Sequence, residues 1–153
     1  HSCALQDMQS FFKNKKIKKS YLALVDRSCQ KEQGIITSCI YKKKEHFFAV
    51  HQSKGSKAIT SWQLVQTSKK ASLLRVYPIT GKTHQIRLHL QSIGHPILGD
   101  YQYQRQFSCP FFAKRPLLHA ESIAFIHPIT AKPLHVSAEL PPDLQQAIDA
   151  IFV

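Results

Sequence analysis

Acidic residues are scarce in this chain of 153 residues. It has 9 Asp and Glu against 21 Lys and Arg, for a formal net charge of +12, and no acidic residue occurs between His46 and Gly99. Such one-sided charge favours a polyanionic partner, most simply nucleic acid. A membrane surface is less favoured because no basic amphipathic helix has the apolar face that insertion requires. Two basic clusters stand out, one over residues 13–19 and one at Lys42, Lys43 and Lys44.

Features that define other protein classes are also missing. The four cysteines form no C-x-x-C pair, so we expect reduced thiols in a cytoplasmic protein. No apolar run approaches the roughly 18 residues of a membrane span, so we expect no membrane partner. The chain starts with His1 rather than Met, and no signal sequence precedes it. We therefore expect it to begin inside a longer protein.

A metal-dependent hydrolase is the least favoured interpretation of the nine histidines. His84 and His89 are five residues apart and would lie on different faces of a helix. Neither an H-E-x-x-H motif nor a cysteine pair supports a zinc site. The absence of a glycine-rich phosphate loop argues equally against a nucleotide-dependent enzyme. We expect no metal and no other cofactor.

What the chain does contain is a series of short apolar segments of strand length. With 43% apolar residues it can bury the core of one domain. Strands are predicted at 21–25, 35–40, 47–51, 58–66, 72–79, 117–126 and 134–140, and helices at 4–14, at about 83–93 and from Pro141 onward, with Leu144, Ile148 and Ile151 on the inner face of the last. The pattern predicts an α+β fold with a mixed or mostly antiparallel sheet and flanking short helices.

The most informative segment is 78–100, which has clear helix start and stop signals. Thr83 can cap a helix, Gly94 suits its left-handed end, and Pro96 prevents continuation. The N-terminal end of this helix, reinforced by Lys82, would attract an anion. A solvated face on a core helix is the plainer alternative. The predicted apolar stripe is Ile86, Leu90 and Ile93, and the polar face is His84, Arg87 and Gln91.

Several motifs, in this order, resemble those of the RluA-type pseudouridine synthases. Residues 19–25, Lys-Ser-Tyr-Leu-Ala-Leu-Val, are similar to the family's Lys-x-Tyr-x-Ala-Leu-Val strand. Residues 80–89 are similar to its Thr-Gly-Arg-Thr-His-Gln-Ile-Arg-x-His motif, with Lys82 in place of the usual Arg. Shorter matches lie at 58–62, 94–100, 118–120 and 127–130. Together the motifs cover nearly the whole chain.

The resemblance implies an enzyme that isomerises uridine in ribosomal or transfer RNA to pseudouridine without a cofactor. It implies that Tyr21 lies against the target base and assists removal of the C5 proton. Arg87 would pair with the catalytic aspartate, and Leu98 would pack beneath the active site. A basic groove with an aromatic platform suits an enzyme that takes a uridine out of the stack. Contacts with RNA are expected from Lys19, Lys42, Lys43, Lys44, Lys82, Thr83, His84 and Gln85.

The residues alone leave plainer interpretations open. Tyr21 could be a core aromatic on a strand, and Arg87 could form a surface salt bridge. Asp100 reads as a turn residue after Gly99, and His119 and His127 read as structural histidines.

One element of the family pattern is missing. The His-Arg-Leu-Asp motif, which carries the nucleophilic aspartate upstream of the Lys-x-Tyr strand, is absent from residues 1–153. We therefore expect a partial catalytic domain that lacks its N-terminal part and does not form pseudouridine alone. The missing strands would leave an exposed sheet edge. The alternative is a non-catalytic RNA-binding relative that keeps the groove and has lost the nucleophile.

Overall fold

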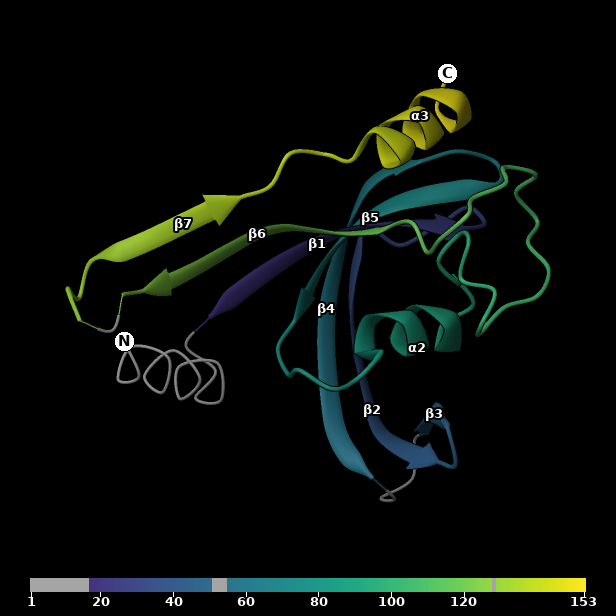
Figure 1. Cartoon of the computed structure of the whole chain (residues 1–153). Coiled ribbons are helices and arrows are strands. Elements are labelled where there is room, and N and C mark those ends of the chain that lie inside the picture. The colour runs from purple at the N-terminus through teal and green to yellow at the C-terminus, as the bar shows by residue number, and fades with distance from the viewer. Residues whose placement is uncertain (1–16, 51–54, 128) are drawn as a thin grey trace.

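A computed structural model describes residues 17–50, 55–127 and 129–153 of the chain. The helix predicted over 4–14 lies outside the described residues, as do residues 13–16 of the first basic cluster. The described residues form seven strands and two helices, namely β1 (Lys18–Asp26), β2 (Gln33–Lys43), β3 (His46–Val50), β4 (Ser56–Thr67), β5 (Ala71–Pro78), α2 (Gln85–Ser92), β6 (Leu118–Ile126), β7 (Pro133–Ser137) and α3 (Pro142–Ile151) (Figure 1).

The seven strands form one sheet in the order β3-β2-β4-β5-β1-β6-β7, and every neighbouring pair is antiparallel. The predicted α+β class and mostly antiparallel sheet are therefore confirmed. Every predicted strand is found in the described residues. β1, β2 and β4 are longer than the apolar runs that predicted them, because polar residues continue the hydrogen-bonded ladder beyond the buried core.

Alternate residues of β1 face two separate hydrophobic layers. Leu22 and Leu24 pack with Leu98 on the side that α3 covers. Ala23 and Val25 pack on the other side, with residues of α2. The period-2 geometry of a strand explains the division, since successive side chains point to opposite faces. β1 is buried on both faces, as its continuous apolar run predicted.

The start and the end of α2 differ in how well the sequence predicted them. His84, not Thr83, occupies the N-cap position, with a left-handed φ of 55° and no capping side-chain hydrogen bond. The predicted Thr83 cap is therefore wrong. Gly94 has a φ of 84°, so the predicted left-handed stop is confirmed. The helix ends before Ile93, which is 37% exposed and does not extend the apolar stripe of Ile86 and Leu90.

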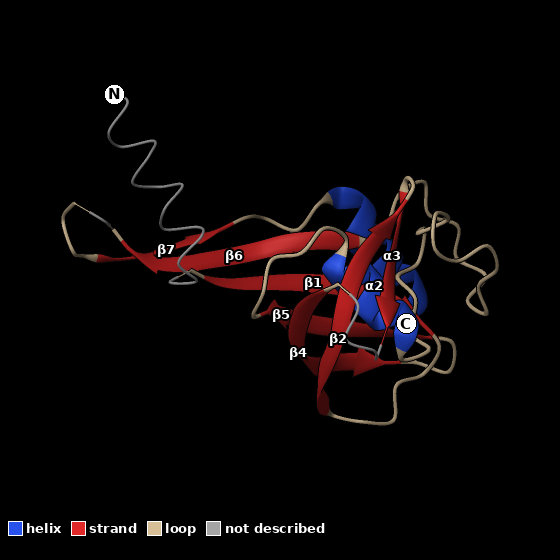
Figure 2. Ribbon diagram, turned by 90° about the horizontal axis from the view of Figure 1, so that it is seen from below, coloured by secondary structure: helices blue, strands red, loops and turns tan. Residues whose placement is uncertain are grey.

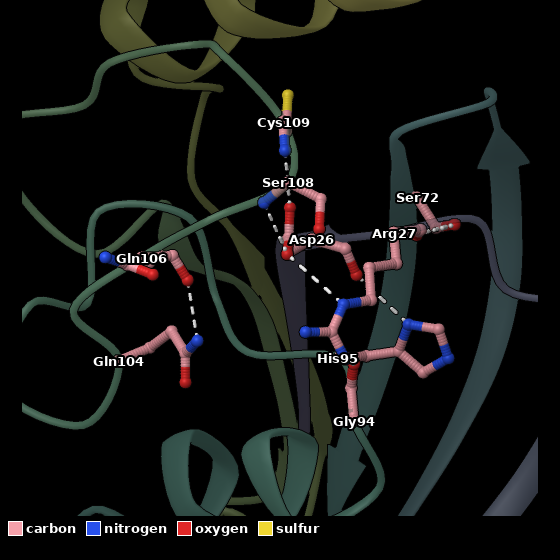
Figure 3. Close-up of polar contacts among 9 residues, drawn as sticks. All are labelled: Asp26, Arg27, Ser72, Gly94, His95, Gln104, Gln106, Ser108 and Cys109. Carbon is pink, nitrogen blue, oxygen red and sulfur yellow. Dashed lines mark hydrogen bonds and ion pairs between the residues drawn. The ribbon is translucent and has the colours of Figure 1, made fainter.

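The buried carboxylate of Asp26 ties three segments together at the end of β1 (Figure 3). Its two oxygens accept hydrogen bonds from the backbone N–H groups of Ser108 at 3.0 Å and Cys109 at 2.8 Å. Its backbone carbonyl accepts a hydrogen bond from Nδ1 of His95 at 3.1 Å. Arg27 donates to the carbonyl of Gly94 at 3.3 Å. These contacts hold the C-terminal end of α2 against the sheet.

At the other end of the sheet, β6 and β7 run away from the part that carries the helices (Figure 2). β7 is an edge strand, and all five of its residues are exposed. In the described ranges, no helix is long and apolar enough to cross a membrane.

Candidate functional site

A pocket of about 260 Å³ opens where β1, the end of β5 and the first turn of α2 meet. The segments that form it are far apart in the sequence, and the antiparallel pairing of β1 with β5 brings them together. Most of the lining residues belong to segment 78–100, which the sequence analysis found the most informative. Six residues predicted for the site line the pocket, namely Lys19, Tyr21, Lys82, His84, Gln85 and Arg87.

Arg87 forms a bidentate ion pair with Asp100. Its Nε donates to Oδ2 at 2.8 Å and its Nη2 donates to Oδ1 at 2.6 Å. The two side chains are only 17% and 2% exposed, so solvent screens their attraction little. The hydrogen bond to Asp100 raises the pKa of Arg87 above its usual value. Arg87 therefore presents a permanent, fixed cation to the pocket.

Asp100, which the sequence predicted as a turn residue, is also the ion-pair partner of Arg87. It does stand in a turn, since its N–H donates to the carbonyl of Ile97 at 3.1 Å. Gly99 before it has a φ of 81°, and a Cβ there would lie 2.1 Å from the carbonyl oxygen of Arg115. Only glycine fits this position. The Gly-Asp end of the segment 94–100 was the available signal.

The loop after Asp100 holds Arg87 from two further directions. Oε1 of Gln102 accepts a hydrogen bond from Nη2 of Arg87 at 2.8 Å. The guanidinium carbon lies 4.8 Å from the centre of the Tyr103 ring, a cation–π distance. Three of the four residues from 100 to 103 thus contact one arginine. Residues 101–116 have no periodic pattern from which these contacts with Arg87 could have been predicted.

His84 connects this loop to the β2–β3 hairpin. Its Nδ1 lies 2.6 Å from the hydroxyl oxygen of Tyr103, and its ring meets that of Phe47 edge-on at 5.4 Å. Burial lowers the pKa of His84, and the positive charge of Arg87 lowers it further. The imidazole is therefore neutral at pH 7. A contact between His84 and RNA would be a hydrogen bond or a stacking contact, not an ionic one.

The side chain of Gln85, predicted as an RNA contact, is engaged by other parts of the protein. Its side chain is 3% exposed. Oε1 accepts hydrogen bonds from the Thr80 hydroxyl at 2.7 Å and the Lys82 N–H at 3.0 Å. Nε2 donates to the carbonyl of Ile59 and to the hydroxyl of Thr60, both at 2.9 Å. All its polar capacity is used inside the protein, so Gln85 positions the loop that carries Lys82.

The apolar wall of the pocket also differs from the expectation. Tyr21 and Leu118 line the pocket, whereas Leu98 is fully buried in the hydrophobic layer on the opposite side of β1. Leu98 therefore does not line this pocket, and Leu118 does. Among the described residues the Tyr21 hydroxyl makes no hydrogen bond, so it can meet a ligand.

The cations of the site fall into two groups. Lys19 and Lys82 belong to the pocket itself, and the ammonium group of Lys19 lies 4.0 Å from where a Cβ of Gly81 would be. Thr83 is exposed beside the pocket but does not line it. The second group, Lys42, Lys43 and Lys44, is exposed at the tip of the β2–β3 hairpin. The structure thus gathers Lys19 and Lys82 at the pocket and leaves the three hairpin lysines apart.

A larger cavity of about 710 Å³ lies between the β4–β5 turn and the end of α3, and it holds none of the predicted site residues. Within the part of the chain that the structure describes, no three His, Cys, Asp or Glu side chains are placed to hold a metal ion.

Comparisons with known proteins identify the family of the chain. The sequence profile described as RNA pseudouridylate synthase matches residues 1–92. The chain belongs to that family of RNA-modifying enzymes. It is of the RluA type, as its similarity to ribosomal large subunit pseudouridine synthases indicates. It is 34% identical to the synthase C of Vibrio cholerae over 95% of this chain and 47% of that protein. It is 33% identical to the synthase D of Zymomonas mobilis over 93% of this chain and 47% of that protein.

A solved structure has a similar fold. Human RNA Pseudouridylate Synthase Domain Containing 1 superposes with a TM-score of 0.76 over 98% of this chain and 71% of that chain, at 22% identity. The chain spans about half the length of the curated relatives that it matches.

Proposed function

We propose that the chain is the part of an RNA pseudouridine synthase that receives the target uridine in the pocket beside Tyr21 and Arg87. The observation that carries the proposal is Arg87, a cation fixed by Asp100 at a pocket that also contains a tyrosine hydroxyl without a protein partner among the described residues. RNA of the large ribosomal subunit is the proposed substrate, because it is named for the relatives, and transfer RNA is the alternative.

The reaction needs no cofactor because its atoms balance within the uridine. The bond from C1′ to N1 breaks, the base turns, and a bond forms from C1′ to C5. The C5 proton leaves and N1 ends protonated. In this proposal Tyr21 lies against the base and assists removal of the C5 proton. Leu118 supports the base from the apolar side, and Lys19 and Lys82 hold neighbouring phosphates.

The nucleophilic aspartate of this proposal lies outside residues 1–153. Arg87 would meet its carboxylate, lower its pKa and keep it ionised and aimed. Because Nε and Nη2 of Arg87 are occupied by Asp100, the incoming carboxylate would approach through Nη1. We also propose that the protein acts in the cytoplasm.

Tritium release from RNA labelled at C5 of uridine tests the proposal. The chain alone is expected to release no tritium above background. A protein that joins this chain to a His-Arg-Leu-Asp segment is expected to release it. In that protein Arg87→Lys should lose most of the activity and keep RNA binding, because lysine cannot make the bidentate contact. Clear release by the chain alone, or equal loss of binding and activity in Arg87→Lys, would contradict these assignments.

The second candidate is the non-catalytic RNA-binding relative, favoured by the absence of the His-Arg-Leu-Asp motif from the sequence. The same joined protein distinguishes the two. If it binds RNA and releases no tritium from any large-subunit RNA, the binding function alone remains.

A further inference from the structure

The β2–β3 hairpin carries a stacked aromatic pair on the face turned away from α2. Tyr41 and Phe48 are directly opposite each other in the two strands, and their ring centres lie 5.5 Å apart at an interplanar angle of 26°. On the other face of the hairpin, Phe47 packs toward Leu88 of α2. The hairpin therefore has an inner aromatic that contacts the fold and an outer pair that does not belong to that core.

One ring of the outer pair is exposed to solvent. The side chain of Phe48 is 41% exposed, and that of Tyr41 is partly buried. A cross-strand aromatic pair stabilises a hairpin by itself, and that is its plainest purpose. That purpose does not require the partner ring to stay exposed. Figure 1 shows the hairpin at the end of the sheet beyond α2, far from α3.

Lysines lie on the tip side of the pair. Lys43 and His46 form the next cross-strand pair on the same face as Tyr41 and Phe48. Lys44 is exposed in the turn, whereas Lys42 lies on the opposite face, with its ammonium group 5.9 Å from the centre of the Phe47 ring and 3.5 Å from the carboxylate of Glu45. An exposed aromatic ring beside lysines fits a nucleobase stacked on the ring with its phosphate held by the cations.

We propose that Phe48, stacked on Tyr41, is a platform for an unpaired base of the RNA, a nucleotide other than the one that enters the pocket. The inference rests on the proposed RNA substrate and adds a preference for single-stranded RNA at the hairpin. The hairpin is coupled to the pocket through Phe47, whose ring meets His84 edge-on at 5.4 Å. The Phe48 ring lies on the opposite face of the hairpin from Phe47, so RNA bound at the pocket would pass around the edge strand β3 to reach it.

The test compares binding of two RNA probes to the 153-residue chain by fluorescence anisotropy. One probe is a single-stranded RNA of about 12 nucleotides, within the usual range of single-strand sites. The other is the same RNA annealed to its complement. Phe48→Leu keeps the apolar volume and removes the aromatic face. It is expected to weaken single-strand binding by about tenfold, the typical effect of losing one stacked base, and to leave duplex binding and the salt dependence unchanged.

Two further variants keep the test decisive. Phe48→Trp retains an aromatic face and is expected to bind single-stranded RNA at least as well as the unaltered chain. Phe112→Leu replaces another exposed aromatic, 70% exposed and outside the hairpin, and is expected to change nothing. 2-Aminopurine placed along the single strand should show quenched fluorescence at one position, and the quenching should be lost in Phe48→Leu.

The outcomes separate the two proposals. If the unaltered chain binds single-stranded RNA and Phe48→Leu binds it equally well, the stacking platform is overturned and the proposed function stands. An equal loss for duplex and single strand, or in Phe48→Trp, also overturns the platform, since it would reflect a disturbed hairpin. If the unaltered chain binds neither probe, both proposals fall.

Discussion

Arg87 and Asp100 share two parallel hydrogen bonds, of 2.8 and 2.6 Å, in a setting where only 17% and 2% of their side chains are exposed. The contact uses the Nε and Nη2 atoms of the guanidinium. Within the described ranges, Nη1 of Arg87 has no hydrogen-bond partner. Asp100 therefore fixes the direction in which Arg87 can receive a second carboxylate, and it acts on the site through Arg87.

Asp100→Asn is expected to destabilise the chain by about 2 kcal/mol, because it leaves a partly buried guanidinium without its counter-charge. Urea unfolding measures the loss. Asp143→Asn is the matched control. Arg115 and Asp143 form the same bidentate geometry at 2.7 Å for both bonds, but with 42% and 49% exposure. That variant should cost less than about 0.5 kcal/mol. Equal losses would mean that burial does not strengthen the Arg87 pair.

Gln85→Leu is expected to destabilise the chain by roughly 3 kcal/mol, since it leaves the N–H of Lys82 and the hydroxyl of Thr80 without the oxygen to which they donate. Gln91→Leu, on the exposed side of the same helix, should stay within about 0.5 kcal/mol. Thermal unfolding of both variants makes the comparison. Should Gln85→Leu keep its stability and lose RNA affinity, Gln85 would be an RNA contact after all.

We expect His89 to make the stability of the chain depend on pH. The ring is fully buried, with Nδ1 2.7 Å from the Thr60 hydroxyl and Nε2 2.9 Å from the Ser38 hydroxyl. Both hydroxyls can donate or accept, so the neutral ring can accept one of these hydrogen bonds and donate the other. No carboxylate is among these partners to stabilise a charged imidazolium. Burial lowers the pKa of His89 to about 4.

The lowered pKa of His89 determines the direction in which the stability of the chain changes with pH. Below its ordinary pKa of about 6.5, the unfolded chain binds a proton that the folded chain rejects. The free energy of unfolding should therefore be highest above pH 7 and fall by about 3 kcal/mol as the pH drops from 6.5 to 4. Urea unfolding at several pH values, compared with His89→Gln, isolates this contribution. Parallel pH curves for the two proteins would show that His89 does not titrate as described.

Replacing Lys42, Lys43 and Lys44 together with alanine should reduce the slope of log affinity against log salt by about 2, since each phosphate contact with single-stranded RNA contributes about 0.7. Filter binding over a range of salt concentrations gives the slope. The control is the pair Lys69→Ala and Lys70→Ala, exposed at the β4–β5 turn. An unaltered slope in the triple variant would place the RNA away from the hairpin.

The sequence by itself determined the secondary structure, the family and most of the pocket. Apolar runs of strand length predicted β1 to β7, because burial on a sheet repeats every two residues and needs no knowledge of the partner strand. The stop of α2 at Gly94 was predictable for a similar local reason, the left-handed backbone that glycine adopts without strain. Tyr21, Lys82 and Arg87 were found through motifs that stay contiguous in the chain.

The tertiary structure decided which side chains meet. Asp100 and Arg87 are 13 positions apart, and the partnership depends on a loop without periodicity. Leu98 and Leu118 are both apolar residues in matched motifs, but only the sheet geometry puts Leu118 on the face of Tyr21 and Leu98 on the opposite face. Gln85 is polar and sits in an RNA-binding motif, but the approach of β4 and the Thr80 turn engages its amide completely. Local patterns specify how a segment folds, whereas long-range contacts specify what each of its side chains is free to bind.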